Sequence, residues 1–179
     1  MMKRTARNIL QGMYDSKPPN SKPPNSKPLD KPKRMDIHEY YLRMALLAKE
    51  RSTCNRRSVG TVLTNNKNRV VSIGYNGVPS GRIHCINSPC LGANGESGKD
   101  LDMCEAIHAE ISAIAACADI DDIHNAYSTV SPCIHCVKAL LATSCQNIYF
   151  IEEYPHSYSI EMWLNNNRNW NHYSLGEEY

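Results

Sequence analysis

The sequence lacks long hydrophobic runs. No stretch approaches the roughly 18–20 consecutive apolar residues of a membrane-spanning helix, so we expect no membrane span. Residues 1–15 include basic side chains but no continuous apolar segment, so no secretory signal is predicted and we expect a cytoplasmic protein, or host cytoplasm if the source is viral. At 179 residues the chain is also too short for two full enzyme domains.

The sequence also has no strong excess of positive or negative charge, since its formal net charge is only +2. The charge is unevenly distributed. Residues 1–34 carry nine Lys and Arg against two Asp, whereas residues 35–179 carry eleven basic and sixteen acidic residues. An acidic domain does not favour a large nucleic-acid footprint, although the basic arm could contact a polyanion. Nucleic acid is therefore not an expected partner.

The first 34 residues have the composition of an arm. Residues 16–20 and 21–25 repeat the sequence SKPPN, and six of the ten prolines lie between Pro18 and Pro32. Such a segment buries too little apolar surface to offset the entropy lost on ordering. We predict a disordered, basic, proline-rich repeat arm at residues 1–34 and one folded domain at residues 35–179.

Hydrophobic periodicity in residues 35–179 predicts an α/β domain. Asp36 is expected to cap the first helix, with Glu39 as its N3 partner. Predicted helices cover residues 36–51, 105–118, 133–143 and 160–164. Predicted strands cover residues 58–64, 69–75, 126–130, 147–151 and 170–174. The apolar face expected on the first helix comprises Tyr40, Tyr41, Met44, Ala45, Leu47 and Ala48. This order of elements predicts helices on both faces of one mixed sheet of about five strands.

Eight cysteines in a chain without a secretory signal suggest metal binding, catalysis or burial rather than disulfides. Cys133 and Cys136 are spaced i, i+3 on the first turn of a predicted helix, whose N-terminus favours thiolates. His108 begins another predicted helix and can supply a third ligand. Three protein ligands leave one tetrahedral position for water, which is the pattern of catalytic zinc.

Glu110 lies two residues beyond His108, close to the expected metal but not needed as a ligand. A carboxylate there can take a proton from the water and pass it to a leaving group. The spacing H-x-E…P-C-x-x-C is the known signature of zinc nucleobase deaminases, so we expect Glu110 to be catalytic. The alternative is a structural zinc knuckle in which Glu110 is incidental. We do not expect His135 to be a ligand. We expect its side chain to be exposed or to contact the ligands.

Several short motifs carry a resemblance to a known family. They are RSTC at 51–54 followed by VG at 59–60, GYNGVPSG at 74–81, HC at 84–85, HAE at 108–110, and SPC at 131–133 with Cys136. Over residues 36–155 the sequence resembles the deoxycytidylate (dCMP) deaminases of the cytidine deaminase-like superfamily, closest to the bacterial and phage branch. The resemblance implies a three-layer α/β/α fold and zinc-dependent hydrolysis of dCMP to dUMP and ammonia, which supplies dUMP for dTMP synthesis.

The same resemblance implies two substrate-binding residues. In the family the Asn of GYNG lies against the substrate sugar, a role that falls to Asn76, although Asn-Gly also suits a plain turn. A tyrosine shortly after the fourth core strand lines the family's pocket, and Tyr154 stands at the matching distance beyond Cys136. Basic candidates for the 5′-phosphate are Arg56, Arg57 and Arg82.

Four cysteines in the front half of the domain suggest a second, structural zinc: Cys54, Cys85, Cys90 and Cys104. Four thiolates would form a closed site and explain how the aperiodic segment 76–104 is held. The resemblance supports this, because relatives with cysteines at the positions of Cys54 and Cys85 bind a second zinc. His84 is a possible substitute ligand. Buried free thiols are the alternative, and we expect that state for Cys117 and Cys145.

The expected partners are a small nucleotide substrate and further copies of the chain in a homo-oligomer. Part of the family is controlled by dCTP and dTTP, but Ser112 and Asp119 depart from the family pattern, which counts against such control here. One rival function is a base deaminase acting on tRNA or DNA, which would need a basic, aromatic-lined groove. The other is a non-catalytic zinc-stabilised binding module, which the presence of Glu110 disfavours.

Overall fold

The computed structural model describes residues 34–95, 103–154 and 157–176. The chain divides after Arg34, and the fold below is that of the second unit, Met35–Tyr179. The arm predicted at residues 1–34 lies, apart from Arg34, outside the described residues. Within the described parts, no helix has the length and apolar character to span a membrane.

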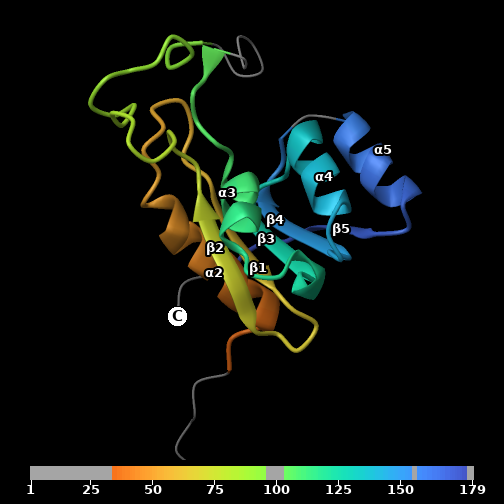
Figure 1. Cartoon of the computed structure of the whole chain (residues 1–179). Coiled ribbons are helices and arrows are strands. Elements are labelled where there is room, and N and C mark those ends of the chain that lie inside the picture. The colour runs from red at the N-terminus through yellow and green to blue at the C-terminus, as the bar shows by residue number, and fades with distance from the viewer. Residues whose placement is uncertain (1–33, 96–102, 155–156, 177–179) are drawn as a thin grey trace, which may run out of the picture. The chain divides into compact units, whose positions relative to one another are not determined.

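The domain is built on one mixed five-stranded sheet with the order β2-β1-β3-β4-β5 (Figure 1). β1 pairs antiparallel with both β2 and β3, whereas β3, β4 and β5 are parallel. This confirms the predicted mixed sheet. The strands are β1 (Gly60–Thr64), β2 (Val70–Tyr75), β3 (Asn125–Val130), β4 (Asn147–Glu152) and β5 (Asn169–His172).

Helices cover both faces of the sheet, which confirms the three-layer arrangement. They are α2 (Ile37–Lys49), α3 (Ala109–Ala116), α4 (Ile134–Leu141) and α5 (Ser157–Asn165), with a short 3₁₀ turn, η2 (Ile120–Asp122). Neighbouring strand residues point to opposite faces. Tyr127 therefore packs in the core beneath α2, whereas Ala126 packs in the core beneath α3, α4 and α5.

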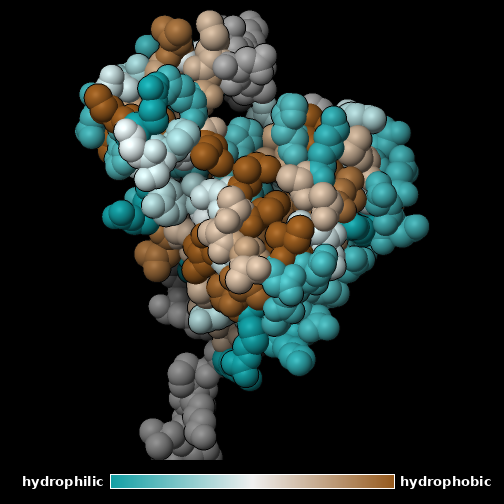
Figure 2. Space-filling model, viewed as in Figure 1, coloured by the Kyte–Doolittle hydropathy of each residue, from teal (hydrophilic) through white to brown (hydrophobic). Residues whose placement is uncertain are grey.

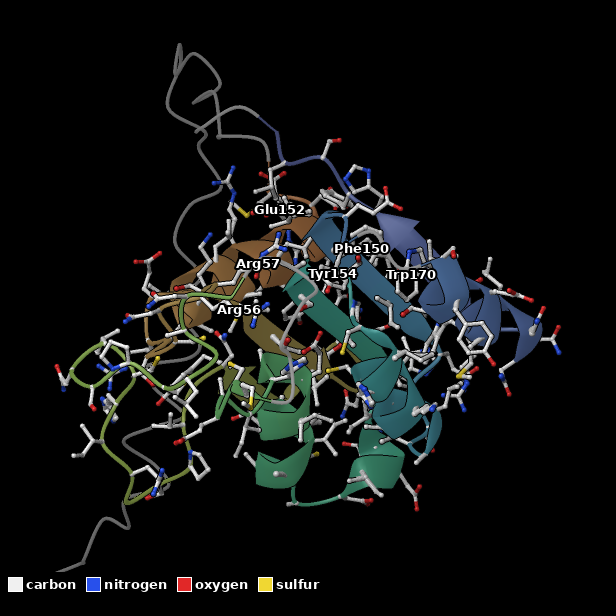
Figure 3. The ribbon with its side chains drawn as sticks, turned by 90° about the horizontal axis from the view of Figure 1, so that it is seen from above. Arg56, Arg57, Phe150, Glu152, Tyr154 and Trp170 are labelled. Carbon is white, nitrogen blue, oxygen red and sulfur yellow. The ribbon has the colours of Figure 1, made fainter. Side chains whose placement is uncertain are left out.

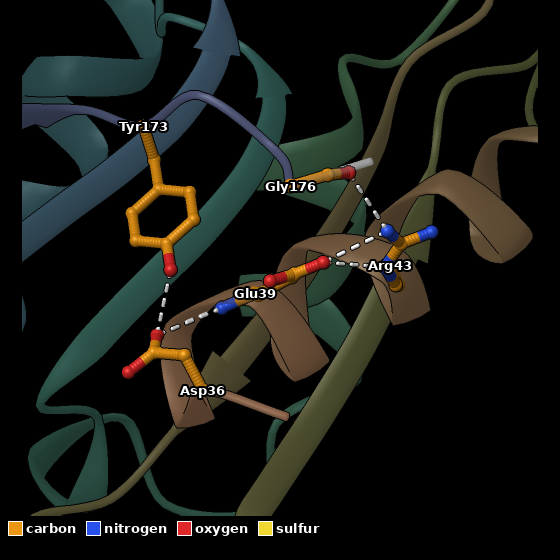
Figure 4. Close-up of polar contacts among 5 residues, drawn as sticks. All are labelled: Asp36, Glu39, Arg43, Tyr173 and Gly176. Carbon is orange, nitrogen blue, oxygen red and sulfur yellow. Dashed lines mark hydrogen bonds and ion pairs between the residues drawn. The ribbon is translucent and has the colours of Figure 1, made fainter. Parts of the chain in front are cut away.

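The first helix begins where the sequence predicts. The Asp36 carboxylate accepts a hydrogen bond from the backbone N–H of Glu39 at 3.2 Å, as expected of an N-cap. Glu39 differs from the prediction, because its carboxylate binds the Arg43 guanidinium at 2.8 Å instead of closing a capping box. The Tyr173 hydroxyl donates to Asp36 at 2.8 Å, and Arg43 donates to the Gly176 carbonyl at 3.3 Å (Figure 4). These contacts attach the segment after β5 to α2.

The helix predicted over residues 105–118 is shorter, because α3 begins only at Ala109. Residues before it are extended, since Ile107 and Gly77 exchange two backbone hydrogen bonds of 2.9 and 3.2 Å. His108 is consequently the N-cap of α3, with φ −67° and ψ 152°. The non-local bridge therefore determines where the helix starts and fixes the backbone of His108.

Helix α3 lies very close to β2. A Cβ atom on Gly74 would be 2.3 Å from the Ala109 carbonyl oxygen and 2.4 Å from the Ala113 nitrogen. The Ser72 hydroxyl donates to the Ala113 carbonyl at 2.7 Å, in the same contact. Because only glycine leaves room for this approach, Gly74 sets the distance between the helix and the sheet.

Three asparagines occupy paired positions at the first residues of β3, β4 and β5. Asn147 donates its side-chain amide to Asn125 at 2.8 Å, and Asn169 donates to Asn147 at 2.7 Å. Asn125 in turn donates to the Thr64 hydroxyl of β1 at 3.0 Å. We call this set the asparagine ladder. Its directional hydrogen bonds hold four adjacent strands in one register.

Candidate active site

The starts of α3 and α4 bring together one histidine and two cysteines. His108 Nδ1 lies 3.4 Å from Cys133 Sγ and 3.3 Å from Cys136 Sγ, and the two sulfur atoms are 3.7 Å apart. Zinc with bonds of about 2.0–2.3 Å in a tetrahedral shell separates neighbouring ligand atoms by about 3.5–3.8 Å. Among the described residues, these three form the group whose ligand atoms all lie within 4.8 Å of one another. The donor set and its spacing fit zinc.

Charge in this group already favours a cation. The pKa of Cys133 is lowered to about 3, first by its hydrogen bond with Cys136 and also because His108 lies beside it. The pKa of Cys136 is raised, because the neighbouring Cys133 sulfur and burial both disfavour a second thiolate. The pKa of His108 is raised by its contact with Cys133. A cation would replace the protons that this group shares.

Glu110 lies in the first turn of α3 and is only 4% exposed. Its Oε2 accepts from Cys136 Sγ at 3.3 Å. Burial is the main cause that raises the pKa of this carboxyl. A buried carboxyl with a raised pKa holds a proton more readily than an exposed one, so it can both accept and return a proton as a general acid and base must.

His108, Glu110 and Cys133 line a cavity of about 410 Å³, whose wall also includes both predicted substrate residues, Asn76 and Tyr154. The cavity opens beyond the carboxyl ends of β3 and β4, since its wall includes Val130 and Tyr154. His135 is exposed, as predicted, and lines the same cavity. The sequence does not predict that His135 lines the cavity. It shows only that His135 lies on a different face of the helix from Cys133 and Cys136.

Asn76 holds the segment that precedes β1. Its Oδ1 accepts from the Ser52 hydroxyl at 2.7 Å and from the Val59 N–H at 2.8 Å, and its Nδ2 donates to the Arg57 carbonyl at 2.6 Å. Within the described part of the chain Nδ2 donates this one hydrogen bond, so its second hydrogen is available to a ligand. The residue that the family resemblance links to the sugar therefore also shapes the cavity wall.

Ser131 positions Tyr154 and was missed in the sequence. The backbone N–H of Tyr154 donates to the Ser131 hydroxyl at 2.7 Å, and Ser131 is 3% exposed. Ser131 in turn donates its backbone N–H to the Glu152 carbonyl at 2.8 Å. Its place just before Pro132 and Cys133 was the available signal, but only the fold shows that it reaches the end of β4.

The three candidate phosphate-binding arginines are separated by the fold. Arg57 forms an ion pair with Glu152 at 2.8 Å beside Tyr154, where Figure 3 shows the two side chains pointing toward each other. Arg56 lines the cavity and donates to the Gly92 carbonyl at 3.2 Å. Arg82 is not brought to this cavity, because it lines a smaller one and pairs with Glu105 at 2.9 Å.

The four front-half cysteines are neighbours. Cys85 and Cys90 have their sulfur atoms 3.8 Å apart, and Cys90 also contacts Cys104. Cys104 contacts Cys54, and burial raises the pKa of the Cys104 thiol. Backbone donation from Glu105 lowers the pKa of Cys90. Cys54 and Cys104 line the active-site cavity as well, so the two cysteine groups share a wall.

Comparison with known proteins agrees with this geometry. Residues 35–152 match the profile of the cytidine and deoxycytidylate deaminase zinc-binding region. Deoxycytidylate deaminase of Mycobacterium phage D29 is 32% identical over 127 residues, covering 67% of this chain and 98% of the phage protein. Deoxycytidylate deaminase of Schizosaccharomyces pombe is 35% identical over 119 residues, covering 64% of this chain but only 37% of the yeast protein.

Comparison of the fold with solved structures also finds a dCMP deaminase. The structure of dCMP deaminase from the cyanophage S-TIM5, in complex with dCMP and dUMP, superposes with a TM-score of 0.62. That comparison covers 78% of this chain and 100% of the cyanophage chain at 24% identity. With the metal-ligand triangle, the buried carboxyl and the family profile in agreement, the chain belongs to the cytidine and deoxycytidylate deaminase family of zinc-binding proteins.

Proposed function

We propose that this protein deaminates dCMP hydrolytically to dUMP and ammonia. The observation that carries the proposal is the buried Glu110 carboxyl, 3.3 Å from Cys136 in a cavity shared with His108 and Cys133. Relatives named deoxycytidylate deaminase and a similarly folded dCMP deaminase in complex with dCMP and dUMP support the choice of substrate.

The residues proposed to hold zinc are His108, through Nδ1, and the thiolates of Cys133 and Cys136. Bound there, zinc would act as a Lewis acid that makes a water molecule nucleophilic at neutral pH. Both cysteines begin α4, so the orientation of that helix sets the direction in which the ligand atoms face the cavity.

Glu110 is proposed to move the protons. Its carboxylate takes a proton from the attacking water and donates it to N3 of the cytosine as the new C4–O bond forms. It then transfers the remaining proton to the amino group, the C4–N bond breaks and ammonia leaves. One water is consumed, and dUMP is released. Burial of Glu110 excludes bulk water from this exchange.

Asn76 and Tyr154 are proposed to hold the nucleotide. The second Nδ2 hydrogen of Asn76 would bind a sugar hydroxyl. Tyr154 forms part of the cavity wall, and Ser131 holds its backbone.

A cytoplasmic location remains a prediction.

A nucleotide panel tests the function. Purified full-length protein loaded with zinc is given dCMP, CMP, dCTP, deoxycytidine and a cytosine-containing single-stranded oligonucleotide. We expect dCMP to be turned over far better than deoxycytidine, because the phosphate adds charge-assisted hydrogen bonds. We also expect only a modest salt dependence, since few phosphates are neutralised. Turnover confined to the oligonucleotide, or equal use of deoxycytidine, would overturn the substrate assignment.

We propose in addition that Cys54, Cys85, Cys90 and Cys104 hold a second, structural zinc. The chain of sulfur contacts from Cys85 through Cys90 to Cys104 supports this. A metal there would tie the segment around Cys90 to the wall of the active-site cavity.

A homo-oligomer is proposed on the basis of the outer face of α3. Figure 2 shows apolar side chains gathered over α3 and the adjoining β2. On α3, Ala115 and Ala116 are exposed, while Ile111 and Ile114 are half-buried. A second copy covering this face would remove that apolar surface from water, and sedimentation equilibrium of the full chain measures the assembly.

A further inference from the structure

We propose that the Arg57–Glu152 ion pair selects substrates by the length of their phosphate chain, with Arg57 binding a single phosphate and Glu152 disfavouring longer chains. The inference rests on the proposed function and goes beyond it by assigning the phosphate end of the substrate. It starts from the position of this pair beside the cavity, where the two side chains are 39% and 53% exposed.

The backbone of Arg57 is fixed. Its carbonyl accepts the 2.6 Å hydrogen bond from Asn76, which is itself 7% exposed. The same Asn76 amide accepts from the N–H of Val59, so the backbone on both sides of Ser58, directly after Arg57, is tied to one buried side chain. The Arg57 side chain therefore extends into the cavity wall from a defined point.

Glu152 is equally well placed on the opposite segment. It is the last residue of β4, in register with Val130 of β3, and its carbonyl accepts from the Ser131 N–H at 2.8 Å. Two residues further on, Tyr154 lines the cavity. The ion pair thus joins the segment before β1 to the end of β4, close to Tyr154 (Figure 3).

Arg57 retains capacity for an anion. Its guanidinium contacts Glu152 through Nη2, and a guanidinium has further N–H donors on Nε and Nη1. An exposed ion pair is also weak, so a phosphate can share or displace it. Arg56 is less suitable, because it is used to hold the Gly92 carbonyl.

Charge around the pair favours one phosphate over several. Glu152 neutralises much of the positive charge that Arg57 offers, and Glu153 adds a second exposed carboxylate next to it. Among the described residues that line the cavity, the side chains able to carry positive charge are Arg56, Arg57, His108 and His135, and no lysine is among them. Each additional phosphate would add negative charge near Glu152, and repulsion of this kind is a common source of specificity.

The test variant is Glu152→Gln, which removes the carboxylate of the ion pair. The matched control is Glu153→Gln, which removes an equal charge from the neighbouring residue. The zinc-loaded full chain is assayed for kcat/KM with dCMP, dCDP, dCTP and deoxycytidine. We expect Glu152→Gln to raise the dCTP-to-dCMP ratio about three- to fivefold, as for an exposed charge pair. Glu153→Gln should change it by less than about twofold.

Arg57 is tested in the same assay. Arg57→Gln should lower the preference for dCMP over deoxycytidine by about 10- to 100-fold through KM, because a charge-assisted contact is lost. Arg57→Lys should restore part of that preference. The wild-type rate on deoxycytidine should persist in Glu153→Gln, whose side chain is outside the cavity wall.

The outcomes separate this inference from the proposed function. Wild-type protein that turns over dCMP while Glu152→Gln leaves the ratio unchanged overturns the inference alone. So does an Arg57→Gln variant that loses dCMP and deoxycytidine turnover equally. Zinc-loaded wild-type protein that fails to deaminate dCMP overturns the proposed function and the inference together.

Discussion

Glu110 is the residue on which the proposed chemistry depends most directly. Glu110→Gln keeps the size and polarity of the side chain but removes its ability to move a proton. We expect turnover of dCMP to fall by about 10²- to 10⁴-fold while zinc content stays unchanged, since Glu110 is not in the ligand triangle. Steady-state kinetics and metal analysis of the same preparation measure both quantities. Glu105→Gln, which alters the partner of Arg82 at the other cavity, serves as the control.

The raised pKa of Glu110 also predicts a pH-dependent cost in stability. In metal-free protein the folded state holds the Glu110 proton more tightly than the unfolded state, whose carboxyl has its ordinary pKa of 4.5. The free energy of unfolding should therefore decrease as pH rises from that value toward the raised pKa. Glu110→Gln removes the titrating carboxyl, and with it this decrease in the free energy of unfolding. Thermal unfolding should show the variant gaining stability over wild type as the pH rises above about 4.5, and a gain that shrinks with rising pH would contradict the assignment.

Residue types that metal chemistry demands are recognisable in a sequence, whereas positioning contacts are not. Zinc requires histidine and thiolate ligands at helical spacing, so His108, Cys133 and Cys136 could be proposed without a fold. The Ser131–Tyr154 hydrogen bond and the Arg57–Glu152 ion pair join residues 23 and 95 positions apart. Nothing in the local pattern around either residue indicates the partner.

At the scale of elements, local periodicity predicted the strands better than the helix ends. Each predicted strand lies within two residues of its observed position, because β propensity and turn residues are local signals. Helix α3 was predicted too long, since the Ile107–Gly77 bridge depends on the fold. The face of α2 was also partly wrong. Tyr40 and Leu47 are 48% and 73% exposed, whereas Leu42, which was not assigned to that face, is completely buried.

The asparagine ladder predicts a graded effect on stability. Asn147→Ala removes two side-chain hydrogen bonds and should lower the free energy of unfolding by about 1–3 kcal/mol. Asn169→Ala removes one such bond at an exposed edge and should cost about 0.5–1.5 kcal/mol. Chemical denaturation measures both. Equal effects of the two variants would show that the ladder does not act as a connected network.

The proposed structural zinc predicts a stoichiometry. Metal analysis of wild-type protein should find two zinc ions per chain, and Cys90→Ser should retain one and unfold at a lower temperature. Cys117→Ser is the matched control, because Cys117 contacts the Asp119 carbonyl instead of the cysteine group. It should keep both ions. One zinc in wild-type protein would remove the second site without affecting the first.

At the scale of the whole molecule, the domain is predicted to work without its arm. Deletion of residues 1–34 should leave the melting temperature and the dCMP kcat/KM within about twofold of wild type, because a proline-repeat segment makes few native contacts. A matched variant that replaces the basic residues of the arm with serine tests charge separately. A large loss of activity on deletion, but not on replacement, would show that the backbone of the arm docks onto the domain or a neighbouring subunit.

The two ends of the parallel strands differ in role: one end carries the asparagine ladder and the other borders the cavity. The asparagine ladder occupies the first residues of β3, β4 and β5, while the cavity lies beyond the last residues of β3 and β4. The ladder amides therefore offer a built-in spectroscopic reference. In nitrogen-15 spectra, nucleotide binding should shift the backbone signals of Ser131 and Tyr154, while the side-chain amide signals of Asn125 and Asn147 stay in place. Loss of those amide signals would instead mark the separation of the strands, so one spectrum can distinguish occupation of the site from opening of the sheet.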